Sequence, residues 1–153
     1  MTEPLWHFTI GDGPLVATAI HDGTAMRPEL RDRLALTDAE KLYAEDPHTS
    51  IWASIAPTRI VGCRSRFEVD LNRPRDKAIY LSPDDAWGLQ VWREPLPDDA
   101  VARSLDQYDQ FYALARLVFE QLVMRQQRLV VFDLHTYNHR RQGPDGPVAK
   151  SEE

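Results

Sequence analysis

The chain has 153 residues, of which 42% are hydrophobic and 27% charged, a composition typical of one globular domain rather than of a disordered or fibrous protein. Its net charge of −6 argues against a general nucleic-acid binder, and no apolar run approaches the ~20 residues of a membrane helix. The N-terminus lacks the basic start and apolar core of a signal peptide, and the single cysteine, Cys63, cannot form an internal disulfide. We therefore expect a cytoplasmic protein with no nucleic-acid or membrane partner.

The first half of the chain predicts three strands and two helices. Residues 5–10 alternate loosely, as an edge strand does, and residues 15–20 and 58–63 are apolar runs typical of strands. Pro28 favours the start of a short helix. Thr37 and Glu40 have the spacing of a capping box, so a second helix should begin there, run to about residue 45 and end before Pro47. Residues 54–57 have the composition of a loop.

The second half predicts two small strands, a long helix and a final strand. Residues 67–71 alternate apolar and acidic side chains as a strand does, residues 78–81 indicate a small strand, and residues 83–86 a helical turn. A broad apolar stripe at three- and four-residue steps predicts one helix over residues 98–127, with its aromatic residues in the core. Residues 129–134 follow as an apolar strand that we expect to be buried on both faces.

These elements predict a single α/β domain, over residues 1–146, in which helices flank a mixed central sheet. Residues 142–147 are rich in turn-forming glycine and proline, and residues 147–153 are expected to form a disordered tail.

A histidine follows each of two predicted strands. His21 comes directly after residues 15–20, and His135 ends the run that begins at residue 129. If these strands are parallel, both imidazoles emerge at the same edge of the sheet, where ligands of α/β proteins bind. Zn²⁺ prefers imidazole and carboxylate ligands, so a metal site is predicted, although a single histidine is more often a hydrogen-bonded loop residue. The candidates for a third ligand, in order of preference, are the pair Glu45 and Asp46, then Asp22, which adjoins His21 and should point away from it, and His48.

Residues 65–73 contain a second group of candidates. A guanidinium such as that of Arg66 or Arg73 matches a carboxylate, and Asn72 can donate a further hydrogen bond. Asp70 could orient an arginine or a ligand histidine. Because Arg66 and Arg73 lie on either side of a predicted strand, a bend must bring them to one pocket. The simpler alternative is a solvated arginine-rich face, and the interleaved Glu68 and Asp70 disfavour a phosphate or nucleic-acid site.

Five short motifs follow one another along the chain: His21-Asp22-Gly23, Glu45-Asp46, Ser65-Arg66, Asp70-Leu71-Asn72-Arg73 and Asp133-Leu134-His135-x-Tyr137. Their order resembles that of the N-formylglutamate amidohydrolase family, which is related to the zinc carboxypeptidases and aspartoacylases. The resemblance extends over residues 15–145, and the Asp-Leu-Asn-Arg element is its most specific part.

The resemblance implies a phosphorylase/hydrolase-like α/β fold of the zinc carboxypeptidase type. It also implies hydrolysis of a small N-acyl amino acid, typically N-formylglutamate to formate and glutamate. A Zn²⁺ ion would be held by His21, Asp46 and His135. Asp70 and Asp133 would support these ligands. Arg66 would stabilise the oxyanion. The substrate contacts that the resemblance implies come from Arg66, Asn72, Arg73 and Tyr137.

Two departures from the related enzymes are visible. Zinc carboxypeptidases carry a metal-binding acid three residues after the first histidine, where this chain has Thr24. Related hydrolases place a glutamate general base well after the third metal ligand. This sequence ends soon after His135, so we expect it to lack the C-terminal part of the family fold that carries this base. His139 is a candidate to replace the glutamate as the acid-base group. The alternatives are therefore a metal- or carboxylate-binding module without the general base, and an interaction domain whose arginines face a partner.

Overall fold

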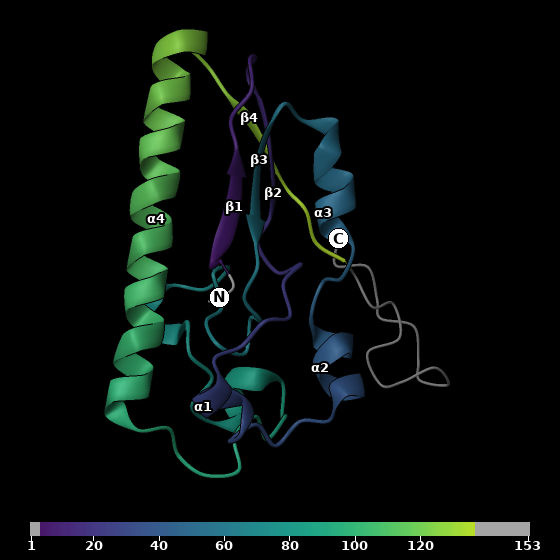
Figure 1. Ribbon diagram of the computed structural model, residues 1–153, viewed down its shortest axis with the longest axis vertical. Coiled ribbons are helices and arrows are strands. Elements are labelled where there is room, and N and C mark those ends of the chain that lie inside the picture. Colours follow the sequence, from purple (N-terminus) through teal and green to yellow (C-terminus); the bar gives the residue numbers. More distant parts are fainter. Residues whose placement is uncertain (1–3, 137–153) are drawn as a thin grey trace.

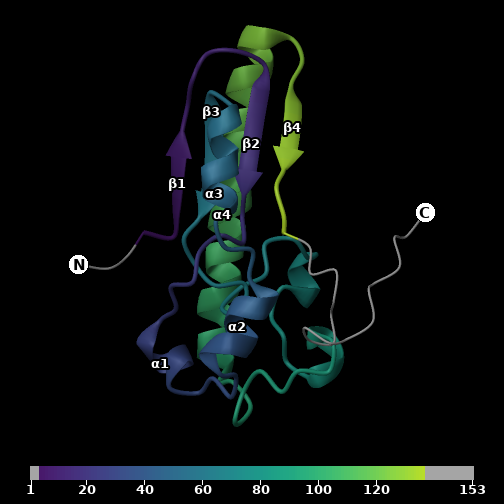
Figure 2. The same ribbon diagram turned by 90° about the vertical axis from the view of Figure 1, so that its right-hand side faces the viewer.

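A mixed four-stranded sheet organises the computed structural model, which describes residues 4–136. Its strands are β1 (Trp6–Thr9), β2 (Leu15–Ala19), β3 (Thr58–Gly62) and β4 (Val130–Asp133), in the spatial order β1-β3-β2-β4 (Figure 2). β1 pairs antiparallel with β3, whereas β2 pairs parallel with both β3 and β4. The parallel pairing of β2 and β4, on which the metal hypothesis depends, is therefore present.

Helices fill both connections between the parallel strands. Those between β2 and β3 are α1 (Pro28–Arg31), α2 (Asp38–Ala44), α3 (Thr49–Trp52) and the 3-10 turn η1 (Ala53–Ile55). Those between β3 and β4 are the 3-10 turns η2 (Arg75–Lys77) and η3 (Pro83–Ala86) and the long helix α4 (Asp98–Gln126). α4 runs along one face of the sheet and α3 lies on the other (Figure 1). No helix in residues 4–136 has both the length and the apolar character that crossing a membrane demands.

The two faces of the sheet are packed differently. On the α4 face, Ile20 and Ile60 meet Phe111 and Ala115 in a core of large side chains. On the α3 face the buried residues are small, and larger, partly buried side chains pack around them. The small residues are Ala17, Ala19, Ala53 and Ala56, and the larger ones are Leu15, Val61 and Leu134. Burial of these faces fixes the register of β2 and with it the position of His21, which lies two residues beyond the end of the strand.

Much of the sequence-based assignment is confirmed. The edge strand, the strands at 15–20 and 58–63, the short helix at Pro28, the turn at 83–86 and the long helix all form within one or two residues of the predicted bounds. The capping box forms as well: the Thr37 hydroxyl accepts from the Glu40 amide (3.2 Å), and Glu40 accepts from the Thr37 amide (2.8 Å). Local sequence signals were therefore sufficient for these elements.

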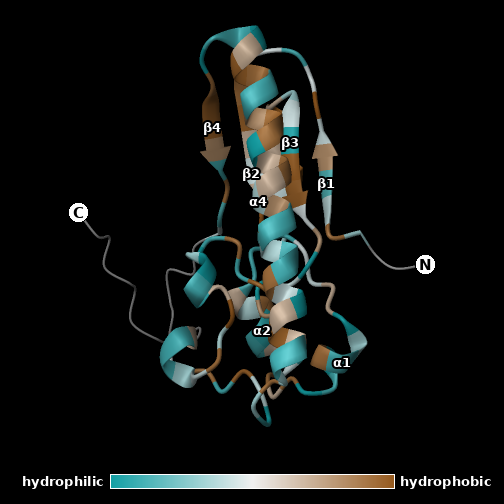
Figure 3. Cartoon of the chain, turned by 90° about the vertical axis from the view of Figure 1, so that its left-hand side faces the viewer, coloured by the Kyte–Doolittle hydropathy of each residue, from teal (hydrophilic) through white to brown (hydrophobic). Residues whose placement is uncertain are grey.

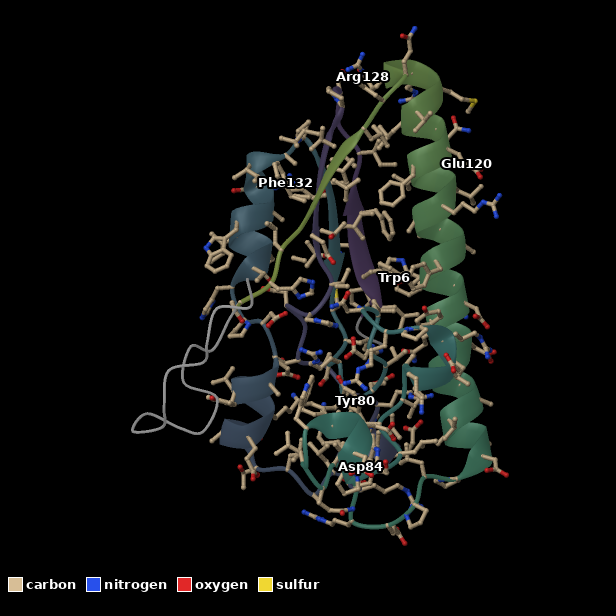
Figure 4. All side chains as sticks on the ribbon, turned by 180° about the vertical axis from the view of Figure 1, so that it is seen from behind. Trp6, Tyr80, Asp84, Glu120, Arg128 and Phe132 are labelled. Carbon is tan, nitrogen blue, oxygen red and sulfur yellow. The ribbon has the colours of Figure 1, made fainter. Side chains whose placement is uncertain are left out.

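The expectation that the strand at 129–134 is buried on both faces is wrong. β4 is an edge strand, and its residues Val130, Val131 and Phe132 are 50%, 44% and 46% exposed. Figure 3 shows its apolar residues at the rim of the sheet, and Figure 4 shows Phe132 on the side of β4 away from α4. The reason is that, among residues 4–136, only β2 pairs with β4.

Three further segments differ from the predictions. Residues 67–71 form turns, and both the apolar and the acidic side chains of this segment are buried, which a two-faced strand pattern does not anticipate. Residues 78–81 form no strand. Their backbone makes isolated hydrogen bonds to loops in place of a regular ladder; for example, the Ala78 carbonyl accepts from the Asp70 amide (2.7 Å). The segment at 54–57 is only partly a loop, since η1 includes Ser54 and Ile55. Tyr137, His139 and the predicted tail at 147–153 lie outside the described residues.

Candidate active site

His21 follows β2 and is buried, with 1% of its surface exposed. Its Nε2–H donates to Asp70 Oδ1 (2.7 Å), and its Nδ1 lies 3.3 Å from Asp46 Oδ2. The backbone of this loop is held against the chain after β3: a Cβ atom on Gly23 would lie 2.1 Å from the carbonyl carbon of Cys63. Only glycine permits this approach, so Gly23 fixes the loop that presents His21.

Asp46 is carried by the tight turn that follows α2. Its amide donates to the His21 carbonyl (3.2 Å), which ties the two segments together, and His48 two residues later has a positive φ of 71°. Asp46 Oδ2 lies 2.7 Å from His135 Nδ1, and Oδ1 accepts from the Thr136 hydroxyl (2.8 Å). Burial favours a raised pKa for Asp46, but the hydrogen bonds from His135, His21 and Thr136 outweigh it and hold the pKa well below its usual range. The carboxylate is therefore ionised.

His135 lies just beyond β4 and faces His21, with the ring centroids 5.1 Å apart. Its Nε2 donates to Asp133 Oδ2 (3.0 Å), and Asp133 Oδ1 accepts from the Thr18 hydroxyl of the neighbouring strand. The carboxylates of Asp133 and then Asp46 raise the pKa of His135 to about 9. Asp133 itself has a lowered pKa, because the bonds from His135 and Thr18 overcome the effect of burial.

His21, Asp46 and His135, hereafter the ligand set, can each offer one donor atom such that all three atoms lie within 4.8 Å of one another. The two inner nitrogens, both Nδ1, converge on Asp46, while the two outer nitrogens, both Nε2, are each bound by a carboxylate. Metal-binding histidines typically have such a carboxylate on the far ring nitrogen, because it fixes the tautomer that directs the other nitrogen's lone pair at the ion. The donors present fit a divalent metal with nitrogen and oxygen ligands.

The competing ligand candidates point elsewhere. Asp22 accepts from the Ser50 amide (3.0 Å) and so holds the first turn of α3. Glu45, next to Asp46, is buried and accepts from the Ser65 hydroxyl (2.5 Å), and burial raises its pKa. Neither Asp22, Glu45 nor His48 belongs to the ligand set within the described residues. The turn at residues 45–48 therefore selects Asp46.

Asp70 connects the ligand set to the arginines. It is fully buried, and besides His21 it binds the Arg66 Nη2 (2.8 Å) and the Tyr80 hydroxyl through its other oxygen, Oδ2. Arg73 Nε lies 3.6 Å from the same oxygen. Burial alone favours a raised pKa for Asp70, but the His21 hydrogen bond and the charges of His21 and Arg66 hold it well below its usual range. One carboxylate thus orients a histidine and two guanidiniums.

Arg66, Arg73, Tyr80 and Trp87 form what we call the arginine–aromatic cluster. The Arg66 guanidinium carbon lies 5.0 Å from the Trp87 ring centroid, and that of Arg73 lies 4.6 Å from the Tyr80 centroid and 5.3 Å from the Trp87 centroid. The turns at residues 67–71 supply the bend that brings the two arginines together. Asn72 is exposed, and its backbone N–H donates to Asp70 Oδ1 (2.9 Å).

Sequence reasoning missed the two aromatic members of this cluster. Figure 4 places Tyr80 among the loops below the sheet, and the Tyr80 hydroxyl is hydrogen-bonded to Asp70, the acid that also binds His21. Tyr80 was assigned to a strand and Trp87 followed a helical turn, and no local pattern distinguishes either from an ordinary core residue. The two rings join the cluster through contacts with arginines that lie 7 and 21 positions earlier in the chain.

An open apolar cavity of about 810 Å³ lies between α4 and the strands β2 and β4. Several of its polar wall groups are paired with protein groups: Thr18 with Asp133, Arg116 with Glu120 (2.7 Å), and Tyr112 with the Leu71 carbonyl (2.6 Å). The cavity adjoins Asp133 but includes none of the ligand set, so we place the candidate chemistry at the ligand set and not in this cavity.

The fold and site together define an α/β protein with a candidate metal centre at the carboxyl ends of its parallel strands, beside paired arginines. The sequence model of the N-formylglutamate amidohydrolase family matches residues 13–151, and the chain belongs to this family. No curated protein matches the chain. The crystal structure of N-formylglutamate amidohydrolase from Ralstonia eutropha JMP134 is similar in fold, with a TM-score of 0.70 and 17% sequence identity. The likeness covers 85% of this chain and 56% of that one, so the chain spans little more than half of its structural relative.

Proposed function

We propose that the protein is a zinc-dependent amidohydrolase that hydrolyses a small N-acyl amino acid, of which N-formylglutamate is the reference substrate, to formate and the free amino acid. The family membership supports an amidohydrolase, and the donor atoms of His21, Asp46 and His135 support the metal. The single cysteine, Cys63, suits a reducing compartment, and on that ground we propose a cytoplasmic location.

The observation that carries this proposal is the convergence of two Nδ1 atoms on Asp46 with a carboxylate behind each outer nitrogen. A Zn²⁺ ion bound there would supply a Lewis acid that polarises the acyl oxygen and lowers the pKa of a bound water toward ~7. Asp70 and Asp133 would hold the protons on the two Nε2 atoms when the ion is bound, so that the Nδ1 atoms, which donate to Asp46 in the metal-free site, could lose their protons and act as ligands.

Two arginines are assigned to the negative charges of the reacting substrate, one to the developing oxyanion and one to the carboxylate. Arg66 is anchored by Asp70, by Tyr80 (3.2 Å) and by the Ala44 carbonyl (3.0 Å), and a guanidinium has five N–H donors, so two remain for the developing oxyanion. Arg73, together with Asn72 and Tyr137, is assigned to the substrate carboxylate, which a planar guanidinium binds through two hydrogen bonds.

A second candidate function is supported by one observation. Amide hydrolysis requires a group that moves a proton, yet the carboxylates at the ligand set are all engaged: Asp46 with both histidines, Asp70 with His21 and Arg66, and Asp133 with His135. Within residues 4–136, no acid beside the ligand set is free to act as a general base. The alternative is therefore a module that binds metal and carboxylate without turnover.

The experiment is carried out on protein purified without a tag. It measures the metal content of the protein and the release of formate from N-formyl-L-glutamate with and without a chelator. We expect about one zinc per chain and turnover that the chelator abolishes; the His135→Ala variant should lose both. The matched control is His7→Ala, since His7 is an exposed histidine on β1 outside the ligand set.

The outcomes separate the two functions. Zinc without formate would favour the binding module. Formate release that survives both the chelator and His135→Ala would refute the metal-dependent reaction, and a protein with neither zinc nor turnover would refute both functions.

A further inference from the structure

Tyr80 is a fully buried tyrosine whose hydroxyl binds two charged side chains. The hydroxyl donates to Asp70 Oδ2 and accepts from Arg66 Nε (3.2 Å), and the same Asp70 oxygen accepts from Arg66 Nη2 (2.8 Å). The three side chains therefore form a closed ring of hydrogen bonds. A buried tyrosine hydroxyl needs a partner, but a single neutral carbonyl is enough to satisfy it. Its contact with both members of an ion pair exceeds what burial requires.

The aromatic ring of Tyr80 supports the second arginine. The Arg73 guanidinium carbon lies 4.6 Å from the Tyr80 ring centroid and 5.3 Å from that of Trp87. Within residues 4–136, this guanidinium makes one ion pair, the long contact of 3.6 Å to Asp70. A guanidinium stacked on a ring keeps the N–H groups in its plane available to other acceptors. Because 25% of the Arg73 side chain is exposed, a molecule from solution can provide such an acceptor.

Both arginines depend on side-chain contacts for their position. They lie at the two ends of the turn segment 66–73, where neither a helix nor a strand carries them. Tyr80, in contrast, is fixed by the core. Its ring packs edge-on against Phe67, with 5.7 Å between the centroids, and its carbonyl accepts from Trp92 Nε1 (2.6 Å). Phe67 and Trp92 are buried in the same hydrophobic cluster as Tyr80, so this one residue links two loop arginines to the close-packed core.

We propose that Tyr80 is a positioning residue for both arginines. Its hydroxyl orients Arg66 towards the developing oxyanion, and its ring orients Arg73 towards the substrate carboxylate. This inference rests on the proposed function for the roles of the two arginines. Weaker anchoring of Arg66 removes an interaction of the transition state and lowers kcat, whereas weaker support of Arg73 removes ground-state binding and raises KM.

The test removes the two parts of the side chain in turn. Formate release from N-formyl-L-glutamate gives KM and kcat, the latter expressed per bound zinc, and calorimetry with L-glutamate gives the affinity of the carboxylate site without turnover. Tyr80→Phe loses only the hydroxyl. We expect kcat to fall about tenfold, while KM and the Kd of L-glutamate stay within about twofold of wild type. Tyr80→Leu loses the ring as well, and we expect a similar fall in kcat with about a fivefold rise in both KM and the Kd of L-glutamate.

Phe111→Leu is the matched control for loss of a buried ring. Phe111 is buried in the core between α4 and the sheet and is not a member of the arginine–aromatic cluster. This variant should lose stability but keep kcat per bound zinc, KM and the Kd of L-glutamate. Circular dichroism verifies that each variant is folded, and Tyr80→Phe, which preserves the packing, keeps the inference falsifiable if Tyr80→Leu does not fold.

The outcomes distinguish this inference from the proposed function. Formate release in the wild type with an unchanged kcat in Tyr80→Phe, or with an unchanged KM in Tyr80→Leu, would overturn the role of Tyr80 and leave the proposed function intact. A wild type that releases no formate would refute the proposed reaction, and glutamate binding would then decide. Binding weakened by Tyr80→Leu but not by Tyr80→Phe would support the role of Tyr80, whereas no binding, or equal binding by the wild type and both variants, would overturn it.

Discussion

Replacing Asp70 by asparagine tests the connection between the ligand set and the arginines. The change keeps the shape of the side chain but removes the charge that pairs with Arg66 and the oxygen that accepts from His21. Since Asp70 is fully buried and Arg66 nearly so, the variant leaves a guanidinium with little solvent and no counter-charge. Removing one partner of such a buried pair typically costs about 3–5 kcal/mol.

The asparagine retains one carbonyl oxygen, so we expect a loss near the lower end of this range. The free energy of unfolding of the metal-free protein should fall by about 3 kcal/mol. The zinc affinity should fall about 10–100-fold as well, because the proton on His21 Nε2 loses the acceptor that fixes it. Urea denaturation of the metal-free protein measures the first effect, and zinc calorimetry measures the second.

Asp133→Asn is the matched control. Asp133 supports His135 as Asp70 supports His21, but 43% of its side chain is exposed, and within residues 4–136 its one ion pair is with His135. The zinc affinity should therefore fall over the same range, whereas stability should change by less than about 1 kcal/mol. If Asp70→Asn left both quantities unchanged, or if the two variants lost the same stability, the account of Asp70 as a buried connecting charge would be refuted.

Three other predictions follow from the same structure. Gly23→Ala should destabilise the protein by at least about 2 kcal/mol, because the new Cβ would overlap the Cys63 carbonyl, and a melting temperature equal to wild type would contradict this packing. Zn²⁺ at ~100 times its Kd should stabilise the wild type by about 2.7 kcal/mol, with no such gain in His135→Ala; equal gains in both would place the ion elsewhere. Burial, with neighbouring Tyr108, raises the pKa of Tyr112 to about 12, so the folded state favours the protonated phenol, which donates to the Leu71 carbonyl (2.6 Å). This stability is present below pH 10 and is lost as the pH rises through 12, so urea denaturation of Tyr112→Phe across that range should show a flatter decline than wild type.

The sequence by itself determined the elements whose signals are local. The apolar runs of β2 and β3, the capping box at Thr37 and the stripe of α4 depend on neighbours within a few residues. The two histidines could also be assigned to one edge, because parallel strands end at the same side of a sheet. The geometry of the ligand set agrees with that assignment, and its role in binding metal stays a prediction.

Only the tertiary structure decided how the acids are used. Residues 67–71 alternate like a strand, yet Glu68 is buried against Gln107 (2.9 Å) and Asp70 against His21, partners 39 and 49 positions away. Likewise Asp46 lies in the ligand set and Asp22 does not, because the turn after α2 points one inward while Ser50 binds the other. A buried charge needs partners that solvate it, and partners so distant in the chain leave no local pattern.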